Sequence, residues 1–257
     1  MLQNPEETKD RVVKWIKEYF DTNLPSASAV IGISGGKDSS VAAALCVAAL
    51  GKERVIGVTI PDGNQPDIDD SNTLIDHLEI PHMEINIGNA TRSFAGLFVD
   101  NVAFKRVTDK NGLVGEAAIN YPPRIRMTVL YAVAQSLQGG GLVVNTCNAS
   151  EDYVGYSTKF GDAAGDFSPL SAFTVEEVLQ IGEALGLPDN LVHKTPSDGL
   201  SGMSDEDKLG FTYAQLDHYL ATGSCEDKVV KEKIDRLHHC NLHKLQPMPG
   251  YKKIEAE

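Results

Sequence analysis

The sequence has few cysteines, few basic residues and no long apolar run. Its four cysteines form no Cys-x-x-Cys pair, which argues against a paired-thiol metal or redox site. Acidic residues outnumber basic ones by 36 to 23, so no nucleic-acid partner is expected, because such a partner favours a basic surface. No apolar stretch reaches the length of a membrane span and no secretory leader is recognisable, so we expect no membrane partner and a cytoplasmic location.

Two familiar nucleotide-binding patterns are also absent. The Walker P-loop requires GxxxxGK followed by Ser or Thr. Here the residue five positions before Gly36 is Ile31, and Lys37 is followed by Asp38. The GxGxxG spacing of the dinucleotide-binding fold is missing as well. What remains is SGGKDSS at residues 34–40, a different kind of glycine loop.

This loop joins a predicted strand over residues 29–33 to a predicted helix over residues 38–50. Gly35 and Gly36 allow a close approach of backbone N–H groups to an anion, and a helix N-terminus adds unpaired donors and partial positive charge. Ser34, Ser39 and Lys37 add hydroxyls and a cation. Asp38 would be unfavourable beside phosphates unless it holds a metal. The loop therefore predicts a phosphate site with a metal-binding acid.

Alternation of strands and helices predicts the fold class α/β, with a doubly wound, mostly parallel sheet flanked by helices. The length of 257 residues fits one domain spanning 1–257. Further strands are expected over residues 55–60, 82–87 and 142–145. Helices are expected from Pro5 and over residues 67–78, 90–107, 174–185, 212–221 and 226–239. Prolines at 122 and 123 predict the start of a long helix, which places Arg124 and Arg126 in or near its first turn. Positive charges there interact unfavourably with the helix dipole.

A long polar segment over residues 145–170 follows the last predicted strand, and loops of this length inside a compact domain are usually functional. Glu151 is predicted to join Asp38 in placing Mg²⁺ on ATP phosphates, because both would follow strand ends at one edge of the sheet. Lys159 would supply positive charge and Asp166 an acceptor. Each of these residues alone is also consistent with a solvated surface.

Five ordered blocks carry a closer resemblance. They are SGGKDSS (34–40), NYPPRIRM (120–127), NTCNASE (145–151), STKFGDAAGDFSPL (157–170) and, near the C-terminus, HKTPSDGL with DEDKLGFTYAQLD (193–217). Together they resemble the ammonia-dependent NAD synthetases of the N-type ATP pyrophosphatase superfamily. The resemblance implies an adenine nucleotide alpha hydrolase-like fold, a homodimer, and amidation of deamido-NAD with ATP, Mg²⁺ and ammonia.

The resemblance also assigns roles to residues. It implies ATP contacts at Gly32, Ile33, Ser34, Gly35, Gly36, Lys37, Asp38, Ser39, Thr146 and Ser197. It implies deamido-NAD contacts at Arg124, Lys159, Asp166, His243 and Lys244. The metal ligands would be Asp38 and Glu151, and the catalytic groups Asp38, Lys37 and Lys159.

Two features depart from the family pattern. The usual Gly-Gly of the KYGDGG block is Ala163-Ala164 here, and the lysine expected about nine residues beyond Asp166 is missing near Val175. Lys194 is a candidate substitute for this cation.

Three other functions fit the loop alone: a GMP-synthetase-like amidase, a tRNA thiolase and a non-enzymatic ATP sensor. The first would carry a glutaminase or a different dimerisation domain, the second a basic surface and paired cysteines, and the sensor leaves the 151–166 segment unexplained. Without an amidohydrolase domain in the chain, free ammonia is the expected nitrogen source, although a partner chain could deliver it.

Overall fold

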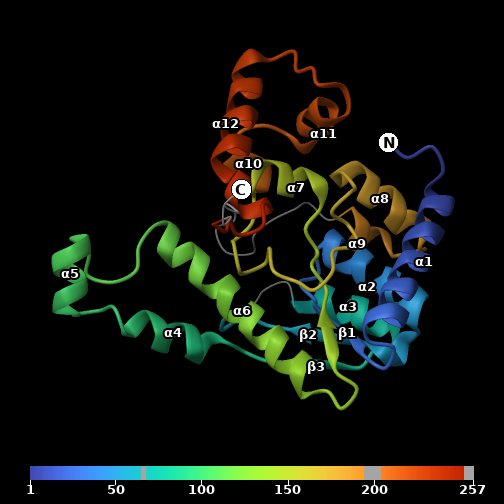
Figure 1. The fold of residues 1–257 in the computed structure, drawn as a ribbon, viewed down its shortest axis with the longest axis horizontal. Helices are drawn as coiled ribbons and strands as arrows, with labels where there is room; N and C mark the ends of the chain where they lie inside the picture. The colour runs from blue at the N-terminus through green and yellow to red at the C-terminus, as the bar shows by residue number, and fades with distance from the viewer. Residues whose placement is uncertain (65–67, 194–203, 252–257) are drawn as a thin grey trace, which may run out of the picture.

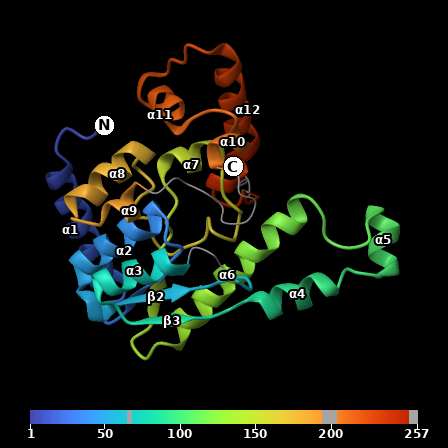
Figure 2. The same cartoon turned by 180° about the vertical axis from the view of Figure 1, so that it is seen from behind.

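The computed structural model describes residues 1–64, 68–193 and 204–251. A parallel sheet with the strand order β3-β2-β1-β4 lies between two layers of helices (Figures 1 and 2). The strands are β1 (Ser28–Gly32), β2 (Val55–Thr59), β3 (His82–Glu84) and β4 (Gly141–Val143). The helices on and around the sheet are α1 (Pro5–Asn23), α2 (Lys37–Leu50), α3 (Ile68–Leu78), α4 (Gly88–Gly96), α5 (Val102–Thr108), α6 (Glu116–Ser136), α7 (Ala149–Val154), α8 (Val175–Ala184) and α9 (Asp189–Val192). The last helices are α10 (Asp205–Leu209), α11 (Tyr213–Thr222) and α12 (Lys228–Leu245).

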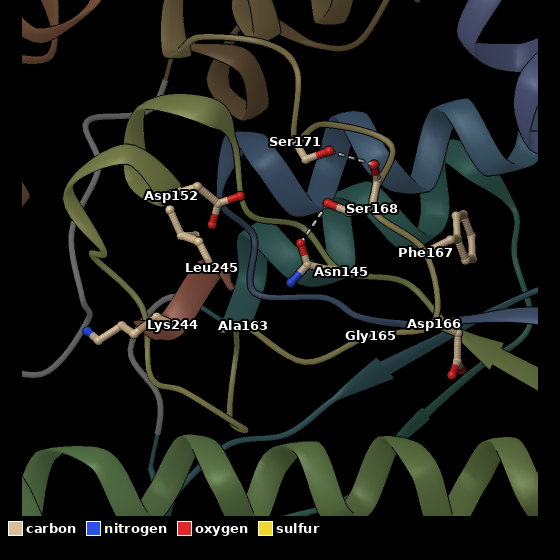
Figure 3. Close-up of a pocket in the computed structure, with 10 residues that line it drawn as sticks. All are labelled: Asn145, Asp152, Ala163, Gly165, Asp166, Phe167, Ser168, Ser171, Lys244 and Leu245. Carbon is tan, nitrogen blue, oxygen red and sulfur yellow. Dashed lines mark hydrogen bonds between the residues drawn. The ribbon is translucent and has the colours of Figure 1, made fainter. Parts of the chain in front are cut away.

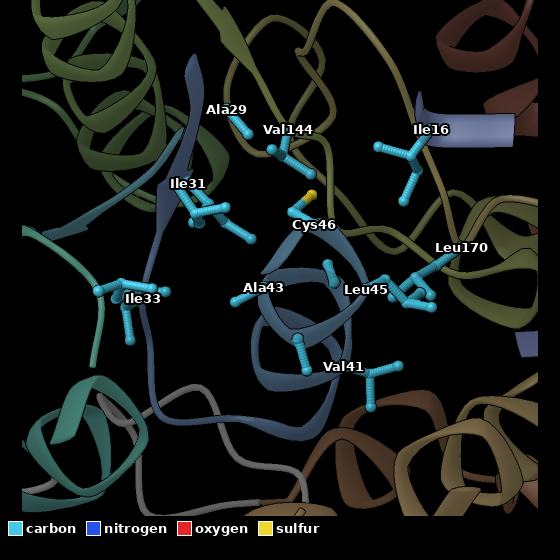
Figure 4. Packing of buried hydrophobic residues seen from close by; sticks show 14 of the residues in the cluster. Ile16, Ala29, Ile31, Ile33, Val41, Ala43, Leu45, Cys46, Val144 and Leu170 are labelled. Atoms are coloured by element: carbon cyan, nitrogen blue, oxygen red, sulfur yellow. The ribbon is translucent and has the colours of Figure 1, made fainter. Parts of the chain in front are cut away.

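Side chains of the central strand alternate between two cores, as the two-residue period of a strand requires. Ala29 and Ile31 face the core under α1, α2 and α8, whereas Val30 faces the core under α6. Figure 4 shows the first of these cores, where Ile31 of β1 and Val144, which follows β4, approach Cys46 of α2. Burial of both sheet faces explains the almost wholly apolar sequence of β1. The predicted doubly wound α/β fold is confirmed.

The strand order creates a crevice beside β1. The chain proceeds from β1 to β2 and β3 on one side and then places β4 on the other side of β1. In open parallel sheets, ligands bind where the strand order reverses, outside the carboxyl ends of the strands. Helix α2 begins just after β1 and α7 just after β4, so both helix N-termini border this crevice.

Two helix predictions were wrong at their boundaries. Helix α6 begins at Glu116 after Gly115 (φ 58°) and contains Pro122 and Pro123 in its interior. Proline removes a helical hydrogen bond but does not always end a helix. Arg124 therefore lies about two turns inside the helix, so the expected conflict with the helix dipole does not arise.

The helix expected over residues 90–107 is interrupted. Asp100 adopts a left-handed conformation (φ 57°), and the Asn101 side chain caps the new helix α5 by accepting from Phe104 N at 3.0 Å. Helices α4, α5 and the first turns of α6 form an arm that projects from the body (Figure 1). The described part of the chain contains no helix long and apolar enough to cross a membrane.

The C-terminal helices form a cap beside α7. Leu209, Leu216 and Ile234 from α10, α11 and α12 are buried in a core of their own with Val154 of α7. Helix α12 runs to Leu245, further than the predicted end near residue 239. His243 and Lys244 therefore lie in its last turn and not in a tail.

Candidate active site

The phosphate loop is held in shape by its own serines. Ser34 Oγ lies 3.0 Å from Ser39 Oγ, which donates to Gly36 O at 3.0 Å. Gly35 has φ 76°, and a Cβ there would lie 2.8 Å from the Asp70 Cβ, so this position requires glycine. Gly36 is the N-cap of α2 and makes no side-chain cap bond. The loop therefore presents the first N–H groups of α2 toward the crevice, as an anion site needs.

Lys37 and Asp38 form an ion pair at the start of α2. Lys37 Nζ lies 2.7 Å from Asp38 Oδ2, and the lysine side chain is only 5% exposed. Burial by itself lowers the pKa of Lys37, but the carboxylates of Asp38 and Glu151 outweigh it and raise the pKa. The lysine therefore stays protonated and available to an anionic ligand.

Asn148 links this pair to Glu151. Its side chain donates to Asp38 Oδ1 at 2.9 Å and accepts from Glu151 N at 3.0 Å, and its own N–H donates to Glu151 Oε2 at 3.5 Å. Burial and the neighbouring Asp38 raise the pKa of Glu151 well above its ordinary value. Two neighbouring acids with one nearby lysine form a site that favours an added cation.

Asp38 and Glu151 offer carboxylate oxygens, which are ligands of the kind that Mg²⁺ prefers. Among the described residues, no group of three or more His, Cys, Asp or Glu side chains gathers as a metal site. Mg²⁺ is usually bound by one or two carboxylates, with phosphate and water oxygens as its other ligands. Asp38 and Glu151 therefore fit a Mg²⁺ ion that arrives with a nucleotide.

A polar cavity of about 350 Å³ lies beyond the end of β4 (Figure 3). Asn145, Asp152, Ser168 and Lys244 are among the residues that line it. Asn145 Oδ1 accepts from Ser168 Oγ at 2.8 Å. Burial, followed by the charge of Asp162, raises the pKa of Asp152 to about 6.

Four of the predicted deamido-NAD residues gather at one place. Lys159 Nζ donates to His243 O at 2.5 Å, and Arg124 Nε donates to Lys159 O at 3.2 Å. Lys244 Nζ donates to Gly155 O and Ser157 O at 2.6 and 2.8 Å. The residues come from α6, from the segment after α7 and from α12, so the fold brings together positions more than 100 residues apart. Their contacts with a ligand stay a prediction.

Asp166 lies apart from this group. Its carboxylate accepts from Val143 N at 2.7 Å and from the Tyr131 hydroxyl at 3.3 Å, which ties the segment after α7 to strand β4. Figure 3 shows the Asp166 carboxylate on the far side of the cavity from Asp152 and Lys244. If Asp166 also accepts a hydrogen bond from the ligand, as predicted, it does so in addition to holding this segment against β4.

The other predicted ATP residues differ in what they can contribute. Gly32 ends β1, and Ile33 is buried with its N–H bonded to Val58 O at 2.9 Å; the Ile33 carbonyl already accepts from Ser71 Oγ at 3.2 Å. Thr146 is partly exposed just after β4. Ser197, and the candidate substitute cation Lys194, lie outside the described residues. At the position of the missing lysine, the Val175 side chain is buried against the cap, so it supplies no cation.

Sequence reasoning missed Asn148 and Tyr213. Asn148 and Glu151 form a capping box at the start of α7, and the N-x-x-E pattern could have revealed it. Tyr213 is buried beside the loop, with Lys37 Nζ 5.7 Å from its ring centroid. Burial, then the carboxylates of Glu151, Asp205 and Asp38, raise the pKa of Tyr213. No local pattern signals this contact, because Tyr213 and Lys37 are far apart in the sequence.

A glycine loop before a buried helix and a doubly wound parallel sheet are the features of the adenine nucleotide alpha hydrolase-like fold, and Asp38 and Glu151 lie near its switch point. A family model described as NAD synthase matches residues 8–254, and the chain belongs to this family.

Proteins named NH(3)-dependent NAD(+) synthetase are among its relatives. The one from Thermoplasma acidophilum is 37% identical over 240 residues, covering 90% of this chain and 93% of that protein. The one from Alkaliphilus metalliredigens is 36% identical over 246 residues, covering 94% and 97%.

Solved structures show the same similarity. The NMN synthetase from Francisella tularensis superposes with a TM-score of 0.83 at 33% identity, covering 97% of this chain and 99% of that one. The NAD+ synthetase from Burkholderia pseudomallei gives a TM-score of 0.72 at 26% identity, covering 95% and 91%.

Proposed function

We propose that this protein is an ammonia-dependent NAD synthetase, an ATP-dependent amide-forming ligase that converts deamido-NAD to NAD with release of AMP and pyrophosphate. The observation that carries the proposal is the junction at Asn148, which joins the phosphate loop at Asp38 to Glu151 across the crevice. A generic phosphate loop would need no second acid there. Family membership and the two relatives named NH(3)-dependent NAD(+) synthetase support the same activity.

The reaction has two steps. The carboxylate of the nicotinate ring attacks the α-phosphorus of ATP, and the bond to pyrophosphate breaks. Ammonia then attacks the carbonyl carbon of the acyl adenylate, and AMP leaves with one oxygen of the former carboxylate. ATP provides the activation, so the protein has to supply positioning and charge and not a nucleophile. The N-terminus of α2, Ser34, Ser39 and Lys37 would hold the phosphates.

Asp38 and Glu151 would hold Mg²⁺ with the nucleotide. The ion would neutralise phosphate charge and stabilise the leaving pyrophosphate. The raised pKa of Glu151 supports this assignment, because an ion would relieve the repulsion between the two acids. Among the described residues, Lys37 and the Asn148 N–H are the groups that favour the charged form of Glu151.

Deamido-NAD would be bound by Arg124, Lys159, Asp166, His243 and Lys244. Lys159 and Lys244 now donate to backbone carbonyls. These bonds hold the end of α12 against the segment after α7, beside the polar cavity. A phosphate of the dinucleotide would replace a carbonyl as the acceptor of each lysine, and charged acceptors make the stronger bond.

A homodimer formed through the arm fits the surface of the described residues. Exposed apolar side chains gather on the arm: Leu97, Val99, Val102, Val107, Val114 and Ile119. Phe94, Phe98 and Tyr121 line an apolar cavity of about 350 Å³ in the same region, and Arg124 lies at its wall. Such a concentration of exposed apolar surface is typical of an interface. We further propose a cytoplasmic location, since four free cysteines suit a reducing compartment.

A second candidate is the synthesis of NMN by amidation of nicotinate mononucleotide. The observation that favours it is the NMN synthetase from Francisella tularensis, which matches nearly the full length of both chains at a TM-score of 0.83. The chemistry at the phosphate loop would be unchanged, and only the part of the substrate beyond the nicotinate ribose phosphate would differ.

A direct comparison of substrates separates the candidates. The purified protein is supplied with Mg²⁺, ATP and ammonium and with either deamido-NAD or nicotinate mononucleotide, and NAD, NMN and AMP are quantified by chromatography. A higher kcat/KM for deamido-NAD supports the first candidate, and a higher value for the mononucleotide supports the second. No amide product from either substrate would contradict both.

A further inference from the structure

The Tyr213 hydroxyl is a buried polar group without a hydrogen-bond partner among the described residues. The side chain is 4% exposed. Buried hydroxyls in folded proteins are nearly always bonded, because an unmade hydrogen bond in the interior is costly. An orphaned hydroxyl next to a candidate ligand site therefore indicates that the missing partner belongs to the ligand.

The backbone and ring of Tyr213 are firmly placed. Its N–H donates to Glu206 Oε1 at 2.8 Å, and the preceding Thr212 caps α11. The ring packs in the core of the cap, and Lys37 Nζ lies over its face at 5.7 Å from the centroid. Tyr213 is thus a direct contact between the C-terminal cap and the phosphate loop.

Carboxylates lie near the Tyr213 hydroxyl. The carboxylates of Glu151, Asp205 and Asp38 are its electrostatic neighbours, yet none of them accepts its proton in a hydrogen bond. Tyr156, from the segment after α7, behaves differently, because its hydroxyl donates to Asp205 Oδ1 at 3.0 Å. Both tyrosines lie near Asp205, but only the Tyr156 hydroxyl forms a hydrogen bond with it.

A protonated phenol at neutral pH is a donor that requires an acceptor. Water bound to a cation is a poor acceptor because its lone pair is engaged, whereas a phosphate oxygen is a strong one. The ligand proposed for this crevice brings several phosphate oxygens to the N-terminus of α2. We propose that Tyr213 binds ATP and that its hydroxyl donates to a phosphate oxygen beside Lys37 and Asp38. This inference rests on the proposed function only in requiring that Mg·ATP binds at the loop.

Tyr213→Phe tests the proposal, because it keeps the ring, its packing and the contact with Lys37 while removing the hydroxyl. Mg·ATP binding is measured by titration calorimetry without a nicotinate substrate, and thermal unfolding is measured without ligand. A hydrogen bond to a charged acceptor corresponds to roughly tenfold to hundredfold in affinity. We expect that loss of Mg·ATP affinity and a melting temperature of the unliganded variant no lower than that of the wild type.

Tyr156→Phe is the matched control. Its hydroxyl already has a partner in Asp205, so we expect a lower melting temperature and Mg·ATP affinity within about twofold of the wild type. A second readout is the NMR signal of wild-type protein labelled with ¹³C at the phenol carbon of tyrosine. One resonance, absent from Tyr213→Phe, should shift when Mg·ATP binds.

The outcomes are distinct. Unchanged Mg·ATP affinity in Tyr213→Phe, or no shift of the Tyr213 resonance, overturns this inference and leaves the proposed function standing. A loss of affinity that Tyr156→Phe shares equally assigns Tyr213 a structural role and also overturns it. Failure of the wild-type protein to bind Mg·ATP overturns both this inference and the proposed function.

Discussion

Replacement of Asn148 by alanine would break the connection between the phosphate loop and α7. The side chain is fully buried and makes two bonds, one to Asp38 Oδ1 at 2.9 Å and one from Glu151 N at 3.0 Å. Loss of an N-cap costs about 1 kcal/mol, and loss of a hydrogen bond to a charged group costs roughly 1.5–3 kcal/mol. The free energy of unfolding should therefore fall by roughly 2–4 kcal/mol.

Asn148→Ser separates the two contributions, because serine caps a helix as well as asparagine does but is too short to reach Asp38. Thermal unfolding of the unliganded proteins is the assay. For a chain of this size, 1 kcal/mol corresponds to about 2–4 °C, so Asn148→Ala should lower the melting temperature by roughly 5–15 °C, and Asn148→Ser by less. A free energy of unfolding of Asn148→Ala within about 0.5 kcal/mol of the wild-type value would show that the Asn148 side chain does not hold the phosphate loop to α7.

Three further predictions concern the acids and the arm. Asp38→Asn should keep the circular dichroism spectrum of the folded protein but lower its melting temperature, because the buried Lys37 loses its ion pair, and Mg·ATP-dependent turnover should fall by roughly 10²–10³-fold, an estimate taken from the loss of one preorganised charge contact; wild-type-like turnover would remove Asp38 from the metal site. Burial and Asp38 raise the pKa of Glu151 in the folded protein, so its contribution to stability is present at low pH and is lost as pH rises through that raised pKa. Glu151→Gln should accordingly stabilise the unliganded protein at neutral pH and flatten the pH dependence of its melting temperature, and a lower melting temperature at neutral pH would contradict this assignment. Val102→Asp on the arm, where the side chain is 80% exposed, should shift the protein from dimer to monomer in light scattering, whereas Val229→Asp on α12, 74% exposed, should not; equal behaviour of the two variants would rule out the arm as the interface.

Patterns in the sequence predicted the part of the site that is formed by residues next to one another in the chain. Three neighbouring stretches show this: the apolar run of β1, the glycines of the loop and the small residues of α2. Each of them favours one kind of backbone geometry. The helix expected from Pro5 is confirmed as α1, and Glu7 N donates to Oδ1 of its N-cap residue Asn4 at 3.2 Å.

Predictions failed where a local signal competes with packing. Pro122 and Pro123 suggested a helix start, but Pro122 is buried, and tertiary contacts hold α6 through both prolines. Asp100 and Asp109 take left-handed conformations that delimit α5, and aspartate permits this without requiring it. Strand β3 ends at Glu84, earlier than the alternation of its residues predicted.

The contacts across the site depend on the fold. Asn148 meets Asp38 only because β4 lies beside β1, and Tyr213 meets Lys37 only because the C-terminal cap packs against α7. Nothing in the spacing of these residues encodes either contact. The resemblance to a family predicted which residues form the site, whereas the structure shows how these residues are held in the fold.

The central claim, that a nicotinate carboxylate is activated by ATP at the loop, is tested most directly by oxygen transfer. Deamido-NAD labelled with ¹⁸O in its carboxylate is converted with Mg²⁺, ATP and ammonium, and the products are examined by mass spectrometry. We expect one ¹⁸O atom in AMP for each NAD formed and none in pyrophosphate. Unlabelled AMP, or formation of ADP and phosphate in place of AMP and pyrophosphate, would contradict it.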